Sequence, residues 1–391
     1  MVRVRVPRET MDIEQPLRLL GGLSAARFMK KHWQRKPLLV RGAFPAMTPP
    51  VERSRLFALA GQEGVESRLV AREPDGRWRM RQGPFGPRSL PPRSRPGWTL
   101  LVQGMDLHDA GVHRLMQSFR FVPEARLDDV MVSWASDGGG VGPHFDSYDV
   151  FLLQAQGRRR WRIGRQDDLS LQPGVPLKVL ARFEPEQEWV LEPGDMLYLP
   201  PRYAHDGIAE GECQTYSIGF RAPARGELAR ELLQRLADDA AGELGESLYR
   251  DAAQPATATP GALPAALREF AHAAVAAALR EPSLLDRALG EYLSEPKPNV
   301  WFEPGMTPPA LRHVALDGRT RMLYDERHVF VNGESWRAAG RDAALMHRLA
   351  DRRSLDAREL ARASDAARAL LAEWCAAGWL HESATAVKEG V

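Results

Sequence analysis

His144 and Asp146, with one residue between them, are the side chains in this sequence whose types and spacing most directly suggest chemistry. Alternate side chains of a strand share a face, so this imidazole and carboxylate would lie together, ~7 Å apart along the backbone. Such a pair supplies two ligands of a 2-His-1-carboxylate triad, which holds Fe(II) with positions open for reactants. Of the 10 histidines, only His144 is followed two residues later by an acidic residue. The alternative is a chance pair at an exposed strand end.

A third ligand would have to come from a later strand, and His205 is the candidate. It follows the apolar run MLYL (196–199), which two prolines terminate. His205 would then lie at the mouth of a barrel, where metal and ligand sites often occur. Before His144, the glycine-rich segment 138–142 would let the backbone approach a ligand closely. The alternative for His205 is a turn histidine on the surface.

Arg159 is the candidate to bind a second group. In RRRWRIG (158–164), alternation places Arg159 with Trp161 and Ile163 on one face. That face is expected to be internal, and a buried cation is costly unless a carboxylate pairs with it. The planar guanidinium suits a ligand carboxylate, and a dicarboxylate that reaches both iron and Arg159 fits 2-oxoglutarate. The alternative is a solvated ridge in which every arginine of this run is exposed.

Ser133 lies on the strand that precedes the His144/Asp146 pair. Its hydroxyl is placed to donate a hydrogen bond to the same dicarboxylate. A buried hydroxyl that hydrogen-bonds only to backbone is the alternative.

Residues 128–222, which contain all these candidates, are expected to form the barrel that positions them. Short β-like runs alternate there with turn signals, which is typical of an antiparallel jelly roll or barrel. We expect one hairpin with its turn at Gln156-Gly157 and a second around 192–195. Helical patterns follow over 225–250 and 265–293, and short strands with two further helices come after residue 301. The predicted fold class is α+β with several domains.

Three stretches carry a resemblance to a known family: HWQRKPLLVRGAF (32–44), SWASDGGGVGPHFDSYDVFLLQAQGRRRWRIG (133–164) and LEPGDMLYLPPRYAHDGIAEGECQTYSIGFRAP (191–223). Here the chain resembles the Jumonji-C (JmjC) Fe(II)/2-oxoglutarate oxygenases, and among them the bacterial ribosomal oxygenases, which are ribosomal-protein arginine hydroxylases. The resemblance implies a double-stranded β-helix (jelly-roll or cupin) oxygenase domain over 1–222, a helical dimerisation segment over 223–300 and a winged-helix-like domain over 301–391.

The same resemblance implies roles for the candidate residues. His144, Asp146 and His205 would bind Fe(II), Arg159 would bind the distal carboxylate of 2-oxoglutarate, and Ser133 matches the family's cosubstrate-binding serine. With dioxygen, such an enzyme would hydroxylate the β-carbon of an arginine in large-subunit ribosomal protein sixteen and release succinate and carbon dioxide. Asp137 and Glu210 are candidates to receive the guanidinium of that arginine.

Composition limits the partners and the compartment. Among 391 residues, 53 basic and 51 acidic side chains leave a net charge of +2, so we expect no direct DNA binding. Two distant cysteines and the lack of an apolar leader predict a reduced, cytoplasmic protein without a membrane span. The Ala/Leu-rich helical patterns predict a homodimer, or alternatively packing within one chain.

Two other functional classes stay open from the residues alone. One is a cupin-type metalloenzyme without oxygenase chemistry, such as a zinc or manganese isomerase or hydrolase. The other is a ligand-responsive DNA-binding regulator. Only the oxygenase needs Arg159 to bind a dicarboxylate.

Overall fold

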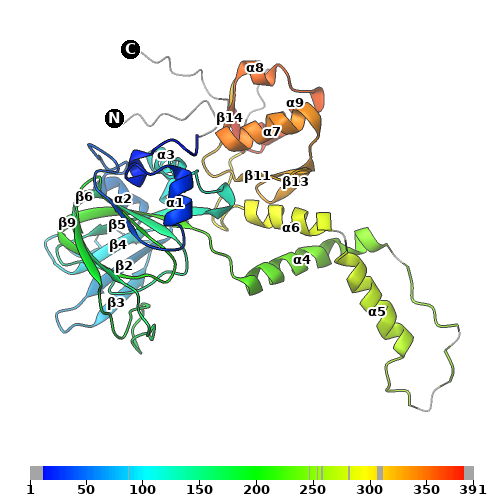
Figure 1. Cartoon of the computed structure of the whole chain (residues 1–391), viewed down its shortest axis with the longest axis horizontal. Helices are drawn as coiled ribbons and strands as arrows, with labels where there is room; N and C mark the ends of the chain where they lie inside the picture. Colours follow the sequence, from blue (N-terminus) through cyan, green and yellow to red (C-terminus); the bar gives the residue numbers. More distant parts are fainter. Residues whose placement is uncertain are drawn as a thin grey trace. The chain divides into compact units, whose positions relative to one another are not determined.

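The computed structural model describes residues 12–86, 88–245, 247–252, 254–256, 259–280, 282–305 and 311–382. The chain folds as an N-terminal unit, Met1–Ala222, and a C-terminal unit, Pro223–Val391 (Figure 1).

The N-terminal unit is built around one large sheet. Its described strands are β1 (Leu38–Val40), β2 (Ser67–Arg72), β3 (Trp78–Gln82), β4 (Trp98–Val102), β5 (Leu127–Ala135), β6 (Val150–Gly164), β7 (Gln187–Leu191), β8 (Met196–Leu199) and β9 (Ala204–Phe220). Its described helices are η1 (Arg18–Leu20), α1 (Ala25–Lys31), α2 (Arg53–Leu59), η2 (Met105–Leu107), α3 (Ala110–Gln117) and η3 (Glu124–Arg126).

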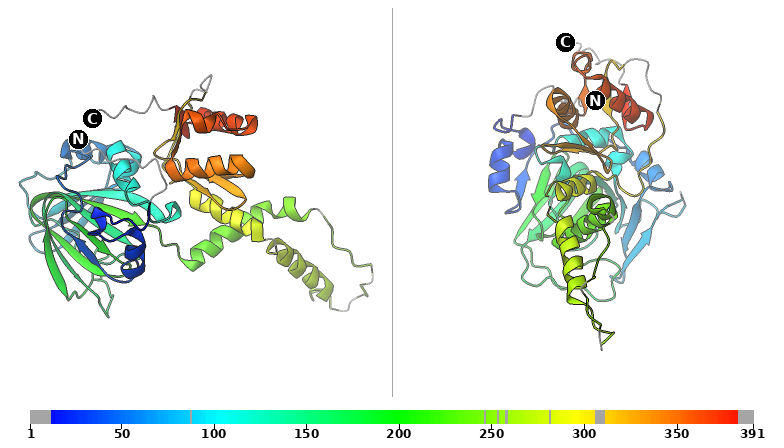
Figure 2. Two further views of the ribbon diagram at one scale, coloured as in Figure 1. Left: turned by 45° about the horizontal axis from the view of Figure 1, so that its top comes forward. Right: turned by 90° about the vertical axis from the view of Figure 1, so that its right-hand side faces the viewer.

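These strands pair in the order β1-β8-β6-β9-β5-β4-β2-β3, and β7 adds to β6. Every ladder of this sheet is antiparallel. The long strands β6 and β9 lie side by side through most of their length, and Figure 2 shows the strong curvature of the sheet. The arrangement confirms the predicted antiparallel jelly-roll-like fold, because neighbours in this sheet are mostly not neighbours in sequence.

Both predicted hairpins are wrong. β6 continues through Gln156-Gly157 as one strand, with irregular pairing to β9 on either side of Gln156. β7 and β8 do not pair with each other: β8 pairs with the first part of β6 and β7 with the last part. The irregularity bends β6, so that its two ends acquire different neighbours.

The irregularity in β6 also changes which residues face the interior. Before it, even-numbered residues such as Val150 and Leu152 enter a buried cluster, and after it the odd-numbered Trp161 and Ile163 enter the same cluster. One extra residue on a strand reverses the alternation of its side chains. The bulge therefore places Arg159, which shares the parity of Trp161, on the inner face.

Aromatic packing attaches the N-terminal helices to the sheet. Ser24 caps α1 by accepting a hydrogen bond from the Arg27 amide at 3.2 Å. Phe28 of α1 is fully buried, with ring centroids 5.5 Å from Phe151 on β6 and 5.0 Å from Tyr198 on β8. This contact supports the pair of strands that lead into the candidate site.

The C-terminal unit is mixed. Its described helices are α4 (Arg225–Leu244), α5 (Ala265–Ala278), α6 (Pro282–Ser294), α7 (Gly340–Arg352), α8 (Ala357–Leu360) and α9 (Asp365–Ala376). Its described strands are β10 (Val314–Leu316), β11 (Met322–Tyr324), β12 (His328–Val331), β13 (Glu334–Arg337), β14 (Ser354–Leu355) and β15 (Leu380–Glu382).

Small sheets and helices share one core in this unit. The sheets have the orders β14-β10-β15 and β11-β12-β13. Leu349 of α7, and Leu371 and Trp374 of α9, are buried against them. Among the described residues, no helix combines the length and the apolar character that a membrane crossing requires.

Candidate functional site

The structure brings His144, Asp146 and His205 together. Each offers one ligand atom, and these atoms lie within 4.8 Å of one another. Nε2 of His205 is 3.8 Å from Oδ2 of Asp146, and the two imidazole centroids are 4.2 Å apart. Two imidazoles and a carboxylate in this arrangement are suited to a divalent first-row metal ion.

The backbone, rather than a regular ladder, brings the two histidines together. His144 lies just before β6 and His205 near the start of β9, and the two form an isolated antiparallel bridge. The His144 amide donates to the His205 carbonyl at 3.0 Å, and the His205 amide donates to the His144 carbonyl at 2.8 Å. Residues that exchange both hydrogen bonds are directly opposite each other, so their side chains emerge on the same side.

Carbonyl oxygens hold both imidazole rings in one tautomer. Nδ1 of His144 is 2.9 Å from the Gly142 carbonyl, and Nδ1 of His205 is 3.0 Å from the Tyr203 carbonyl. Because a carbonyl oxygen can only accept, Nδ1 is the donor in each ring. Nε2 then keeps its lone pair for a metal ion, as in metal sites where the other ring nitrogen donates to an oriented acceptor.

His205 is kept neutral by its surroundings. Burial lowers its pKa below the ordinary value, the neighbouring His144 lowers it further, and the Asp146 carboxylate opposes the shift only in part. A neutral imidazole does not have to lose a proton before it binds a metal ion.

Arg159 lies on the inner face, as alternation predicts. It is 5% exposed, whereas the side chains of Arg158, Arg160 and Arg162 on the opposite face are 57%, 40% and 36% exposed. Its Nε and Nη2 atoms are buried without a hydrogen-bond partner. Among the described residues, no carboxylate lies within ion-pair distance of this guanidinium. An uncompensated buried cation is costly, so it indicates a site for an anionic ligand.

Ser133 is next to Arg159. Its Oγ is 3.4 Å from Nη1 of Arg159 and 3.4 Å from the Thr215 carbonyl. The Ser133 hydroxyl therefore contacts both a backbone acceptor and the guanidinium. This geometry is compatible with a cosubstrate-binding serine and with a buried hydroxyl that hydrogen-bonds to backbone.

Of the two acidic residues considered for substrate recognition, Glu210 is not on the inner face. It lies opposite Arg158 in the β6–β9 ladder, and its carboxylate pairs with Arg158 and Arg160. Asp137 is exposed and accepts a hydrogen bond from the Gly211 amide at 2.8 Å. Strand alternation in β9 already separates Glu210 from Ala209, the partner of Arg159.

The indole nitrogen of Trp161 is a polar atom at the site. Strand alternation predicts that Trp161 faces inward, but it does not indicate a role for this nitrogen. Its indole Nε1 is buried and has no hydrogen-bond partner. The ring centroid lies 5.7 Å from the Arg159 guanidinium carbon and 5.8 Å from the His205 ring centroid. The Trp161 ring therefore lies close to both His205 and the buried cation, and it belongs to the same buried cluster as Ile163 and Leu191.

Two domain families match the chain. The JmjC domain matches residues 114–228, which include every residue of the His144/Asp146/His205 trio as well as Ser133 and Arg159. The ROXA-like winged helix matches residues 276–381 and includes α6.

Two relatives each match half of the chain or more. The chain is 34% identical over 322 residues to the ribosomal protein uL16 3-hydroxylase of Escherichia coli. The match covers 78% of this chain and 84% of that protein. It is 37% identical over 202 residues to a probable ribosomal oxygenase of Haemophilus influenzae, over 50% of this chain and 49% of that protein.

Solved structures agree with these matches. The chain superimposes on the crystal structure of E. coli YcfD with a TM-score of 0.79 and 31% identity, covering 92% of this chain and 98% of that one. A structure of YcfD in complex with cobalt and 2-oxoglutarate gives a TM-score of 0.75 and 31% identity, over 91% and 97% of the two chains. With its jelly-roll barrel, inward-facing His/Asp/His trio and C-terminal winged helix, the chain belongs to the bacterial ribosomal oxygenases of the JmjC family.

Proposed function

We propose that this protein hydroxylates the β-carbon of an arginine in the large-subunit ribosomal protein numbered sixteen, with Fe(II), 2-oxoglutarate and dioxygen as reactants. The E. coli relative that is 34% identical is named for 3-hydroxylation of uL16, and carbon 3 of an amino acid is its β-carbon. Succinate and carbon dioxide would be released, and the reaction would take place in the cytoplasm, where the ribosomal protein is found.

His144, Asp146 and His205 would hold the iron. Their donor set matches a facial triad, and the carbonyl partners of both Nδ1 atoms leave Nε2 available for coordination. Three protein ligands leave three positions of an octahedral ion for the cosubstrate and dioxygen.

Arg159 and Ser133 would hold the far carboxylate of 2-oxoglutarate. The unpaired Nε and Nη2 atoms of Arg159 provide donors in the planar arrangement that a carboxylate accepts, and the Ser133 hydroxyl lies beside them. Binding would also neutralise a charge that the protein buries in the absence of the ligand. This unpaired guanidinium beside the trio is the observation that carries the proposal.

When bound, the iron and 2-oxoglutarate supply the oxidising chemistry that an unactivated carbon–hydrogen bond requires. The protein orients both groups through the trio and through Arg159, so that the substrate carbon meets the oxidant in one geometry. Trp161, Ile163 and Leu191 are buried around the same space and exclude water from it.

Intact-mass analysis tests the substrate. Purified ribosomal proteins would be incubated with the enzyme, iron, ascorbate and 2-oxoglutarate, and fragment spectra would locate any added oxygen atom. The proposal expects one oxygen on the β-carbon of one arginine of protein sixteen, and none with the His144→Ala enzyme. Addition to another residue type, or to no ribosomal protein, contradicts it.

We also propose that the chain works as a homodimer, with residues 1–222 carrying the chemistry, 223–300 forming the dimer contact and 301–391 acting as a protein-contact module. α5 supports the middle part of this proposal, because Leu267, Phe270 and Val275 on it are 36%, 40% and 61% exposed and no residue of the helix is buried. Light scattering should give the mass of a dimer, and Phe270→Asp with Val275→Asp should give that of a monomer. A monomeric unmodified chain contradicts this part.

A further inference from the structure

Helix α6 is fastened to the β12–β13 hairpin through the C-terminal half of the helix. A Cβ on Gly290 would lie 2.3 Å from the Phe330 ring, so only glycine permits this close approach. The Ser335 hydroxyl donates to Glu291 Oε1 at 2.5 Å, and the Gly333 amide donates to the Ser294 hydroxyl at 3.1 Å. The hairpin therefore holds a fixed position against the last turns of α6.

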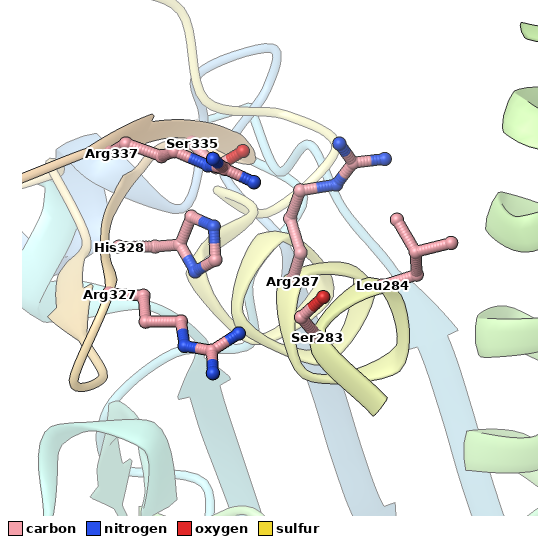
Figure 3. Close-up of a pocket in the computed structure, with 7 residues that line it drawn as sticks. All are labelled: Ser283, Leu284, Arg287, Arg327, His328, Ser335 and Arg337. Atoms are coloured by element: carbon pink, nitrogen blue, oxygen red, sulfur yellow. The ribbon is translucent and has the colours of Figure 1, made fainter. Parts of the chain in front are cut away.

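A cavity of about 440 Å³ opens between the N-terminal half of the same helix and the same hairpin. It lies entirely within the C-terminal unit. Its lining residues are Ser283, Leu284, Arg287, Arg327, His328, Ser335 and Arg337. Figure 3 shows Arg327, His328 and Arg337 extending from the hairpin side, Arg287 and Ser283 on the helix, and Leu284 pointing away.

The lining is strongly basic. Arg327 and Arg337 are exposed, and among the described residues neither has an acidic partner within ion-pair distance. Arg287 has its Nε 3.7 Å from Oε1 of Glu291, and none of the described residues that line the cavity is acidic. Three guanidinium groups and one imidazole thus line one space. Arg287 and His328 each have a carboxylate nearby, whereas Arg327 and Arg337 have none within ion-pair distance among the described residues.

Backbone pairing sets the position of His328 among these arginines. His328 lies directly opposite Arg337 in the β12–β13 ladder, so both side chains share a face. Its side chain is 7% exposed, and its Nδ1 is 3.3 Å from Asp325 Oδ2. The contact with Asp325 orients the ring and leaves Nε2 as the nitrogen that a ligand would meet.

The N-terminal end of α6 adds to the positive potential. The helix begins at Pro282, and Ser283 in its first turn lines the cavity. The first amide groups of a helix lack intrahelical acceptors and favour a nearby anion. Helix end, arginines and histidine therefore all favour the same kind of ligand.

We propose that this cavity binds a small molecule that carries two or more phosphate groups. Its volume falls within the range of small-ligand sites, and arginine binds phosphate oxygens through paired hydrogen bonds. Apart from His328, none of the described residues that line it is aromatic, so recognition rests on the phosphates rather than on stacking of a base. Its lining residues belong to the C-terminal unit, whereas the His144/Asp146/His205 trio belongs to the N-terminal unit.

Isothermal titration of the full-length protein with inorganic tripolyphosphate tests the proposal. We expect one site per chain, and we expect Arg327→Gln with Arg337→Gln to weaken binding by about 100-fold or more, since each change removes charge-assisted hydrogen bonds. Arg362→Gln is the matched control, because Arg362 is an exposed arginine of the same unit outside the cavity. It should leave the affinity unchanged.

Three outcomes would overturn the proposal. The first is no binding of tripolyphosphate at millimolar concentration. The second is equal weakening by the Arg362 control, or equal competition by sulfate at matched ionic strength, since both indicate a general charge effect. The third is that tripolyphosphate does not bind, whereas a single-stranded RNA oligonucleotide binds and requires Arg327 and Arg337. That result would show that these arginines bind a nucleic acid instead. Each binding measurement is made without iron or 2-oxoglutarate, so its result does not depend on the hydroxylase activity.

Discussion

The main chains of His144 and His205 exchange two hydrogen bonds, at 3.0 and 2.8 Å, although the residues are far apart in sequence. Because backbone atoms make this connection, it does not depend on either imidazole. The side chains are consequently free to serve as ligands, and the separation of the two rings is set by the fold.

His144→Ala should remove the metal site and leave the fold intact. The variant keeps the backbone bridge but loses one of three ligands, so we expect its affinity for Mn(II) to fall by at least about 100-fold. Equilibrium dialysis measures this, and circular dichroism monitors the fold. The exposed His272→Ala on α5 is the control and should bind the metal like the unmodified chain. Unchanged Mn(II) binding by His144→Ala would rule out the proposed trio.

Arg159→Met should weaken 2-oxoglutarate binding by about 10- to 100-fold, since it removes charge-assisted hydrogen bonds of about 1.5–3 kcal/mol. It should also leave the melting temperature of the ligand-free protein unchanged or raise it, because the variant no longer buries an unpaired cation. Calorimetry measures both quantities. Arg158→Met, on the outer face, is the control for affinity. If the protein is instead a cupin enzyme without oxygenase chemistry, Arg159→Met will leave the affinity for 2-oxoglutarate unchanged, or neither the unmodified chain nor the variant will bind 2-oxoglutarate.

Gly157→Ala should be strongly destabilising, by about 2–4 kcal/mol or more. Gly157 has a φ of +63°, and a Cβ there would lie 2.1 Å from the Glu212 carbonyl oxygen. Gly211→Ala separates the two effects: its φ is +75°, but nothing lies within 4 Å of its Cβ, so only about 1 kcal/mol of backbone strain is expected. Urea denaturation gives both values. If both variants lose the same free energy of unfolding, the close approach of Gly157 to the Glu212 carbonyl does not contribute to stability.

Asp317 should make the C-terminal unit sensitive to acid. Partial burial by itself raises the pKa of this carboxyl, but hydrogen bonds from Arg319 at 2.7 Å and His381 at 2.8 Å lower it to about 2. Because the folded pKa is below the ordinary 3.8, the stabilisation is fully present above pH 3.8 and disappears as the pH falls through about 2.

Asp317→Asn checks this assignment. The unmodified chain should be more stable than the variant near pH 6, and the difference should shrink between about pH 4 and pH 2 in thermal unfolding followed by circular dichroism. A difference that stays constant over this range would show that the carboxylate charge contributes nothing.

Local patterns were sufficient for part of the site. The alternation of side chains along 158–164 separated Arg159, Trp161 and Ile163 from the outer arginines, because the pleat of a strand depends only on its own residues. The His144/Asp146 pair was likewise visible as a motif, and its residues lie close together in the folded chain. Alternation along β9 places Glu210 and Ala209 on opposite faces, but only the pairing of β9 with β6 puts Ala209 opposite Arg159 and pairs Glu210 with Arg158 and Arg160.

Contacts between distant segments decided the rest. A turn signal at Gln156-Gly157 looks the same in sequence whether the chain reverses or forms a bulge. Only the pairing of β6 with β9 makes it a bulge. β7 and β8 are neighbours in sequence, yet each pairs with a different part of β6. The basic cavity beside α6 similarly depends on Gly290 meeting Phe330, a contact between a helix and a hairpin that no local periodicity specifies.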